Sequence, residues 1–202
     1  MKRIITAFML ITLNISGLAT NVSVSGQTDQ SIDKNSGWWP FLQIVIWPGV
    51  PSYSDKSVYG FRTGFPVSGG SGAVSGAELA PIISASDEIY GVQGAPLISY
   101  AKKAEGVRCS FMNISSKKTK GLQIGAMNLN LQNSSGLDIA VINVASGNMR
   151  GVQLGAGNYA GGERGVQFGI FNMSEWCGVQ FGLINIIQNG WLPFCPIFNI
   201  SF

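Results

Sequence analysis

The ionisable side chains of this chain offer few groups that could act together in catalysis. The acidic residues are scattered, and Asp87 with Glu88 forms the only adjacent acidic pair. Neither a calcium-loop pattern nor further carboxylates accompany this pair, which therefore predicts a solvated loop rather than a metal site. The chain contains no His, on which most familiar catalytic and metal sites depend. We expect no catalytic residue, metal or cofactor, and hence no enzyme.

Lysines form the other charged groups with a regular spacing. Lys102 and Lys103 are followed 15 residues later by Lys117 and Lys118, and Lys120 lies close by. In a chain that repeats at this interval, the two clusters fall at neighbouring turns and could form one basic edge. Such an edge would be either a set of solvated turns or a contact with anionic lipid or polysaccharide.

The net charge argues against nucleic acid as a partner. The chain has 13 Lys and Arg against 10 Asp and Glu, a formal charge of +3, but Lys2 and Arg3 lie in a segment that we expect to be removed. Without them the balance is 11 to 10, or +1. A nearly neutral chain lacks the basic surface that drives binding to phosphate backbones.

The first residues have the pattern of an export signal. Lys2 and Arg3 precede a short apolar run, residues 4–13, which gives way to small and polar residues. An uncleaved anchor helix would need about 20 apolar residues, and Asn14 interrupts the run too early for that. We expect a signal peptide over residues 1–26 and a flexible polar leader over residues 27–37.

The rest of the chain, residues 38–202, is predicted to be a single domain built from an internal repeat. The clearest copies are Gly121–Asn128, Gly151–Asn158, Gly165–Asn172 and Gly178–Asn185, the last of which reads Gly-Val-Gln-Phe-Gly-Leu-Ile-Asn. Nine units begin at Gly60, Gly76, Gly91, Gly106, Gly121, Gly136, Gly151, Gly165 and Gly178, with degenerate capping segments at 38–50 and 191–202. The 27 Gly residues also argue against a mainly helical fold.

Three slots of the unit, counted from its first Gly, carry the strongest constraints. The third slot holds a long or charged polar residue, which must face water or a polar ladder: Arg62, Glu78, Gln93, Arg108, Gln123, Asp138, Gln153, Gln167 and Gln180. The fifth slot is always small, which indicates close packing over the backbone or a sharp turn. The eighth slot is Asn in six successive units, and Asn suits a turn or a stacked amide ladder: Asn113, Asn128, Asn143, Asn158, Asn172 and Asn185.

The apolar residues favour an all-β fold but allow two architectures. They occupy slots two and four and then change phase to slots seven and nine, so one flat strand cannot keep both sets on one face. We favour a parallel β-solenoid in which each unit of about 15 residues is one coil, both apolar sets point inward, and like residues stack about 4.8 Å apart. The alternative is an antiparallel outer-membrane β-barrel, which the aromatic C-terminus would suit, with Phe202 needed for assembly.

The three cysteines allow at most one disulfide within the chain. Cys177 and Cys195 are close enough in sequence to be candidates for pairing. Cys109 occupies slot four, where related units carry Ile, Leu or Phe. We therefore expect Cys109 to be a small buried apolar residue.

The tandem Gly-Val-Gln-Phe-Gly-Leu-Ile-Asn units resemble those of uncharacterised bacterial surface-repeat proteins. The resemblance covers residues 38–202, from Phe41-Leu-Gln-Ile to the closing Pro-Ile-Phe-Asn-Ile-Ser-Phe202, and is weaker before Gly106, where the Asn is missing. It implies an envelope or surface location in a bacterium, without an established activity or known site residues.

These observations predict an exported, non-enzymatic repeat protein of the outer membrane or cell surface with a structural, display or adhesion-type role. In this hypothesis a rigid stack presents its Gln and Asn ladders and its basic edge to an envelope or outer-membrane component, such as lipid or polysaccharide. The alternative function is that of a small outer-membrane barrel serving as a structural or channel component.

Overall fold

The computed structural model of the chain describes residues 41–45, 56–176 and 178–201, with the backbone alone at Glu163. The expected signal peptide and leader, residue 177 of the candidate disulfide, and the terminal Phe202 lie outside the described residues. Among the described residues, none belongs to a helix long and apolar enough to cross a membrane.

The described residues form twelve strands of one sheet, and the strands before β12 pair with equivalent positions of the next unit. The strands are β1 (Leu42–Val45), β2 (Phe61–Gly64), β3 (Val67–Leu79), β4 (Ile83–Ile124), β5 (Met127–Asn130), β6 (Ser134–Ile139), β7 (Ile142–Leu154), β8 (Gly157–Glu163), β9 (Val166–Phe168), β10 (Phe171–Ser174), β11 (Gly178–Ile187) and β12 (Phe194–Ser201).

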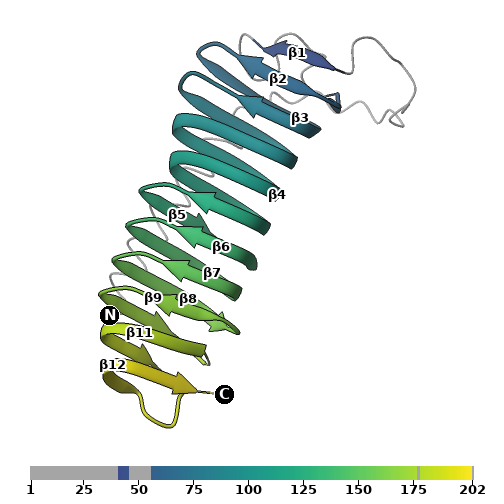
Figure 1. Cartoon of the computed structure of the whole chain (residues 1–202). Helices are drawn as coiled ribbons and strands as arrows, with labels where there is room; N and C mark the ends of the chain where they lie inside the picture. The colour runs from purple at the N-terminus through teal and green to yellow at the C-terminus, as the bar shows by residue number, and fades with distance from the viewer. Residues whose placement is uncertain (1–40, 46–55, 177, 202) are drawn as a thin grey trace, which may run out of the picture. The chain divides into compact units, whose positions relative to one another are not determined.

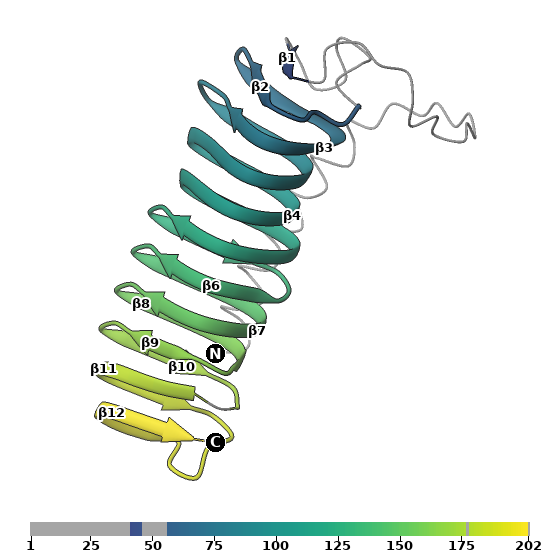
Figure 2. The same cartoon turned by 45° about the vertical axis from the view of Figure 1, so that its right-hand side comes forward.

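The chain from β1 to β12 winds as a parallel β-solenoid of about nine turns, and Figures 1 and 2 show the coils stacked one on the next. The register is that of the repeat, since Asn128 pairs with Asn143 and Gln123 with Asp138. The favoured fold is therefore confirmed. The antiparallel alternative is wrong for the described strands, because the pairings are parallel up to β11 and only β12 runs antiparallel to its neighbour.

Each coil has two walls, two corners and a narrow interior. The Gln wall is the strand that runs from slot fourteen of one unit to slot four of the next, such as β6. The Asn wall is the strand that runs from slot seven to slot ten within a unit, such as β5. We call the bend at slots five and six the tight corner, and the bend at slots eleven to thirteen the polar turn. The small fifth slot has the predicted cause, because a Cβ added at Gly125 would lie 2.4 Å from the carbonyl oxygen of Ser110, one coil earlier.

The interior of the stack is polar at slots three and eight, which reverses our expectation, and smaller apolar clusters such as that of Ala145, Met149 and Ala160 are buried beside these columns. The Gln side chains of slot three and the Asn side chains of slot eight are buried, whereas their neighbours Leu154 and Ile142 lie at least partly exposed on the outside. The prediction that both apolar sets point inward is therefore wrong. Alternation within a strand allows only one phase inside, and the stacking distance of a parallel sheet lets inward amides hydrogen-bond from coil to coil.

The first glycine of each unit fixes how the coils stack. Gly136 has a φ of 124°, and a Cβ added there would lie 2.1 Å from the carbonyl oxygen of Gly121 one coil earlier. The same close approach recurs along the column, for example between Gly151 and Gly136 at 2.0 Å. Both the backbone conformation and the space therefore require Gly at slot one.

Candidate functional site

The Asn wall carries a continuous ladder of side-chain amides. Asn128 Nδ2 donates to Asn143 Oδ1 at 2.9 Å, and Asn143 Nδ2 donates to Asn158 Oδ1 at 2.9 Å. Each Asn before the last also donates to a slot-four carbonyl oxygen of the next coil, as Asn143 does to Leu154 at 2.9 Å. The same pattern links the whole series: Asn113, Asn128, Asn143, Asn158, Asn172 and Asn185. These buried amides thus hold successive coils in register.

The two ends of the Asn ladder differ in their hydrogen bonds. Asn113 Oδ1 has no hydrogen-bond partner among the described residues, because the preceding unit carries Ile98 where the later units carry Asn. At the other end, Asn185 Nδ2 donates to the carbonyl oxygen of Gly182, and Asn199 of β12 donates to the carbonyl oxygen of Leu192. The last Asn is therefore satisfied locally, and the first is not.

The Gln wall carries a second ladder that runs in the opposite direction. Gln180 Nε2 donates to Gln167 Oε1, and Gln167 Nε2 donates to Gln153 Oε1, both at 2.9 Å. Here each donor lies one coil after its acceptor, whereas in the Asn ladder it lies one coil before. Gln153 Nε2 and Gln180 Oε1 have no partner among the described residues, so this ladder is less completely satisfied.

Two of the charged slot-three residues are buried close together near the start of the stack. Arg62 donates to Gln43 Oε1 at 2.5 Å and to Ser86 Oγ at 3.1 Å. Glu78, its neighbour in the sheet, accepts from Ser68 at 2.9 Å and from Ser86 at 2.6 Å. Because buried charges require partners, both residues serve the interior of the stack.

Arg108 and Asp138 form a second charged group in the same column. Arg108 donates to Gln93 Oε1 at 3.0 Å and to Gln123 Oε1 at 3.4 Å, and it also contacts Ser115. Burial lowers the pKa of Arg108 to about 10, against the attraction of Asp138 and Glu78.

Asp138 has its own set of donors. Its carboxylate accepts from Gln123 at 2.9 Å and from Asn130 and Ser134 at 3.2 Å. Burial raises the pKa of Asp138 to about 6 although these contacts oppose it.

The ladder side chains are thus not available to a partner. The structure brings together every Gln and Asn that the sequence indicated, but as columns inside the stack: Gln93, Gln123, Gln153, Gln167, Gln180, Asn113, Asn128, Asn143, Asn158, Asn172 and Asn185. The expectation that the stack presents these ladders to an envelope component is therefore wrong. Their amides already bind one another.

The lysines of the expected basic edge lie among acidic residues. Lys102 forms an ion pair with Asp87 at 2.8 Å, and Lys120 lies 3.5 Å from Glu105. Lys103 donates to the Tyr90 hydroxyl at 2.6 Å, and this hydrogen bond raises the pKa of Lys103. Lys117 and Lys118 are exposed and border the same groove at the polar turns as Lys102, Lys103, Asp87 and Glu88.

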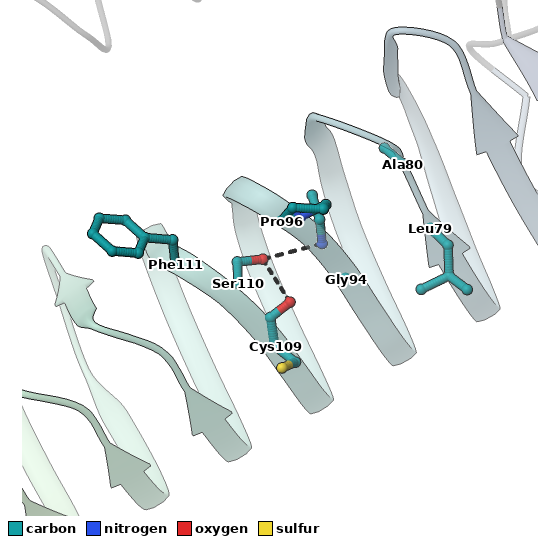
Figure 3. Close-up of a pocket in the computed structure, with 8 residues that line it drawn as sticks. Leu79, Ala80, Gly94, Pro96, Cys109, Ser110 and Phe111 are labelled. Atoms are coloured by element: carbon teal, nitrogen blue, oxygen red, sulfur yellow. Dashed lines mark hydrogen bonds between the residues drawn. The ribbon is translucent and has the colours of Figure 1, made fainter.

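An open depression interrupts the apolar surface near the tight corner, as Figure 3 shows. It lies where Gly94 and Cys109 occupy slot four, between the larger Leu79 and the Phe111 side chain at the corner. Cys109 is exposed there, so the expectation that it is buried is wrong. Cys109 occupies slot four, and this slot faces outward in the other units too.

The outer surface of the stack carries exposed apolar residues at slot four of the Gln wall and slot seven of the Asn wall, whereas Ile114, Leu129 and Met173 at slot nine are buried. Slot four carries Ile124, Phe168 and Phe181, all exposed, and the rings of Phe168 and Phe181 stack at 5.0 Å between centroids. Phe181 in turn lies 5.0 Å from the ring of Phe198 in β12. The repeat pattern predicts these columns, but the expectation that they face the interior is wrong.

Comparison with known proteins finds no matching protein family, no matching curated protein and no matching solved structure. Among the described residues, no group of three or more His, Cys, Asp or Glu side chains is placed so that it could hold a metal ion. The site with the most developed geometry is therefore the pair of buried ladders, together with the apolar surface that they leave outside.

Proposed function

We propose that this protein is an exported, non-enzymatic repeat protein of the bacterial envelope or cell surface with a structural, display or adhesion-type binding role. The observation that carries this proposal is that the polar side chains of the repeat are buried and hydrogen-bonded inside the stack. The Gln and Asn residues of the repeat, with Arg108 and Asp138, are bonded to one another inside the stack. Because these groups stabilise the fold, the surface that remains for a partner is the outside of the coils.

The arrangement of that surface supports a role in binding over a large area. Parallel coils repeat the same outward positions at the strand spacing of about 4.8 Å, so one kind of side chain recurs along the length of the stack. The partner that we propose is a component of the envelope, which includes the lipid of the outer membrane and surface polysaccharide.

Export is the first part of this proposal to test. The full chain is expressed in a Gram-negative bacterium, the cells are fractionated, and the N-terminus of the protein is sequenced. We expect a mature chain in the envelope fraction that begins within residues 20–27. A Leu10→Arg substitution in the apolar run should leave the protein unprocessed in the cytoplasm, whereas Ser31→Ala in the leader should change nothing. Wild-type protein that stays in the cytoplasm with its N-terminus intact would refute the proposal.

The mode of attachment is the second part. The envelope fraction is treated with alkaline carbonate and urea, and in parallel with detergent. Release by carbonate and urea supports a peripheral or surface protein, and release by detergent alone supports contact with the lipid. Recovery of the mature protein in the soluble periplasmic fraction without either treatment would contradict a role in the envelope.

A further inference from the structure

Five of the nine units carry a large, strongly exposed apolar residue at slot six of the tight corner, and the units between them carry Pro or Ala there. The exposed fractions of these five residues reach 72% at Phe65, 60% at Phe111, 59% at Val141, 58% at Ile170 and 67% at Leu183. In a water-soluble domain such a set of large side chains marks an interaction site. We call this set the apolar corner.

Apolar residues continue from this corner onto both walls. In the coil around Val141, the outward residues of the Gln wall are Ile139 and Leu137, and those of the Asn wall are Ile142 and Val144. The next outward position on each wall is polar in this coil, Ser135 on one wall and Ser146 on the other. The apolar surface is thus centred on the corner and has nearly equal flanks.

The coil around Ala156 has smaller residues at slots six and seven, and the coil after it returns to large apolar ones. Around Ile170, the Gln wall has Phe168 and then Val166, and the Asn wall has the exposed Phe171 and then Met173, which is buried. From the unit at Gly121 onward, the outward positions between slots two and nine contain no charged residue in the described part of the chain. At the residue just before the first Gly of a unit, where the apolar flank of the Gln wall ends, three exposed residues are basic: Lys120, Arg150 and Arg164.

The backbone at the apolar corner is hydrogen-bonded from coil to coil. Ala126 N donates to the carbonyl oxygen of Phe111 at 2.9 Å, and Ile142 N donates to that of Ala126 at 3.1 Å. Further along the corner, Ile170 N and Ile184 N each donate to the carbonyl oxygen one coil earlier, at 3.0 and 2.9 Å. Backbone groups that are satisfied in this way can enter hydrocarbon without losing hydrogen bonds to water.

We infer that the apolar corner inserts edge-on into one leaflet of a lipid bilayer, so that acyl chains cover both of its flanks. The inference rests on the proposed function, because it names lipid as the envelope component. From slot six to slot two is about four residues, or roughly 13 Å of strand, which is close to half of the hydrocarbon thickness of about 30 Å. At that depth Arg150 and Arg164, together with Lys120 and its neighbour Glu105, lie at the level of the headgroups, where the charge of Arg150 and Arg164 complements anionic lipid.

Lipid fits this surface better than a second copy of the chain. The two flanks belong to opposite walls of a flattened coil and meet at a projecting corner. A second rigid coil stack could pack against one wall at a time and would leave the other apolar flank in water. A fluid solvent of acyl chains covers both flanks and the corner together.

The test uses the purified mature chain and lipid vesicles. Wild-type protein is mixed with vesicles of phosphatidylethanolamine and phosphatidylglycerol, and the fraction that floats with them is measured. The Val141→Asp/Ile170→Asp double variant places charges on the apolar corner. The Gln132→Asp/Ser146→Asp variant is the matched control, because it places the same charges on exposed positions of the polar turns. Circular dichroism verifies that each variant keeps its β-structure.

We expect the wild type and the control to float, and the corner variant to lose at least about tenfold in its partition constant, because carboxylates are costly in hydrocarbon. A fluorophore on Cys109, with Cys177 and Cys195 replaced by Ser, should shift to shorter wavelength when vesicles are added. Replacing Lys120, Arg150 and Arg164 by Gln should weaken binding to these vesicles but not to phosphatidylcholine vesicles.

Three results would overturn the inference. The first is a wild type that fails to float, and the second is a corner variant that floats as well as the control. A wild-type dimer in solution that the corner substitutions dissociate, without any binding to vesicles, would assign the corner to a second copy. Export is tested separately, so an exported protein that ignores lipid refutes only this inference, and an unprocessed cytoplasmic protein that binds vesicles refutes only the proposed function.

Discussion

Arg108 and Asp138 lie two coils apart in the same buried column, and Gln123 connects them. The Gln123 carbonyl oxygen accepts from Arg108 Nη1 at 3.4 Å, and the Gln123 amide donates to Asp138 Oδ1 at 2.9 Å. A single amide thus has its acceptor toward the cation and its donor toward the carboxylate. This orientation lets an uncharged ladder accommodate two opposite charges.

The pH dependence of stability should report on Asp138. Its pKa in the folded protein is about 6, above the value of about 3.9 for an unfolded chain. Asp138 therefore contributes stability that is fully present below about pH 4 and is lost as the pH rises through about 6. We expect the free energy of unfolding to fall by about 3 kcal/mol from this group over that range.

Urea unfolding at pH 4, 5 and 7 measures this effect. The Asp138→Asn variant should lose this part of the pH dependence, whereas Asp87→Asn should keep it because Asp138 remains. Equal slopes in the wild type and in Asp138→Asn would contradict the assignment.

An interior member of the Asn ladder should matter more than the first one. Asn143→Ala removes the donor to Asn158 and the acceptor for Asn128, and it leaves a buried amide oxygen unpaired. We expect this to cost about 2–4 kcal/mol in the free energy of unfolding. Asn113→Ala should cost less, because the Asn113 oxygen has no partner to lose. Chemical denaturation of the two variants side by side gives the comparison, and equal costs would mean that the ladder is not the source.

The glycine column offers a test of stacking geometry. Gly136→Ala would place a Cβ 2.1 Å from the Gly121 carbonyl oxygen at a φ of 124°, so we expect a loss of more than about 3 kcal/mol or failure to fold. Gly157→Ala is the control, because a Cβ there meets nothing within 4 Å. Thermal unfolding should show Gly157→Ala within about 0.5 kcal/mol of the wild type. A tolerated Gly136→Ala would show that the coils can separate at this column.

Removing two whole units should leave a folded protein. Deletion of residues 121–150 joins Lys120 to Gly151 and brings Asn113 next to Asn158 and Arg108 next to Gln153. Because each coil contacts only its neighbours, we expect a cooperative but less stable stack. Deletion of residues 121–143, which is not a whole number of units, should unfold the protein. Circular dichroism and urea unfolding distinguish the two, and an unfolded 121–150 deletion would refute modular stacking.

The repeat spacing predicts the coil, the parallel register and the stacking of like residues, because each of these depends on sequence periodicity alone. The repeat spacing does not predict which face of each strand points into the interior of the stack. Alternation places Gln153 on one side of its strand and Val152 and Leu154 on the other, but both assignments satisfy that pattern. Hydropathy favours the apolar side for the interior, whereas hydrogen bonds between stacked amides favour the polar side.

The error on Cys109 follows from the same choice, since its slot faces outward with Phe168 and Phe181. The surroundings of the lysines could not be predicted from their own spacing. Asp87 and Glu105 lie one unit before Lys102 and Lys120, so the charges meet only when the coils stack. Ion pairs between units depend on three-dimensional register rather than on runs of like charge.

The reversed direction of β12 has a consequence for assembly. In the described part of the chain β12 pairs only with β11, antiparallel to it, and Pro196 in β12 has no N–H to donate. A second molecule therefore cannot extend the spiral from this end with the register that joins one coil to the next. We therefore expect β12 to disfavour fibre growth by head-to-tail addition of copies through this edge.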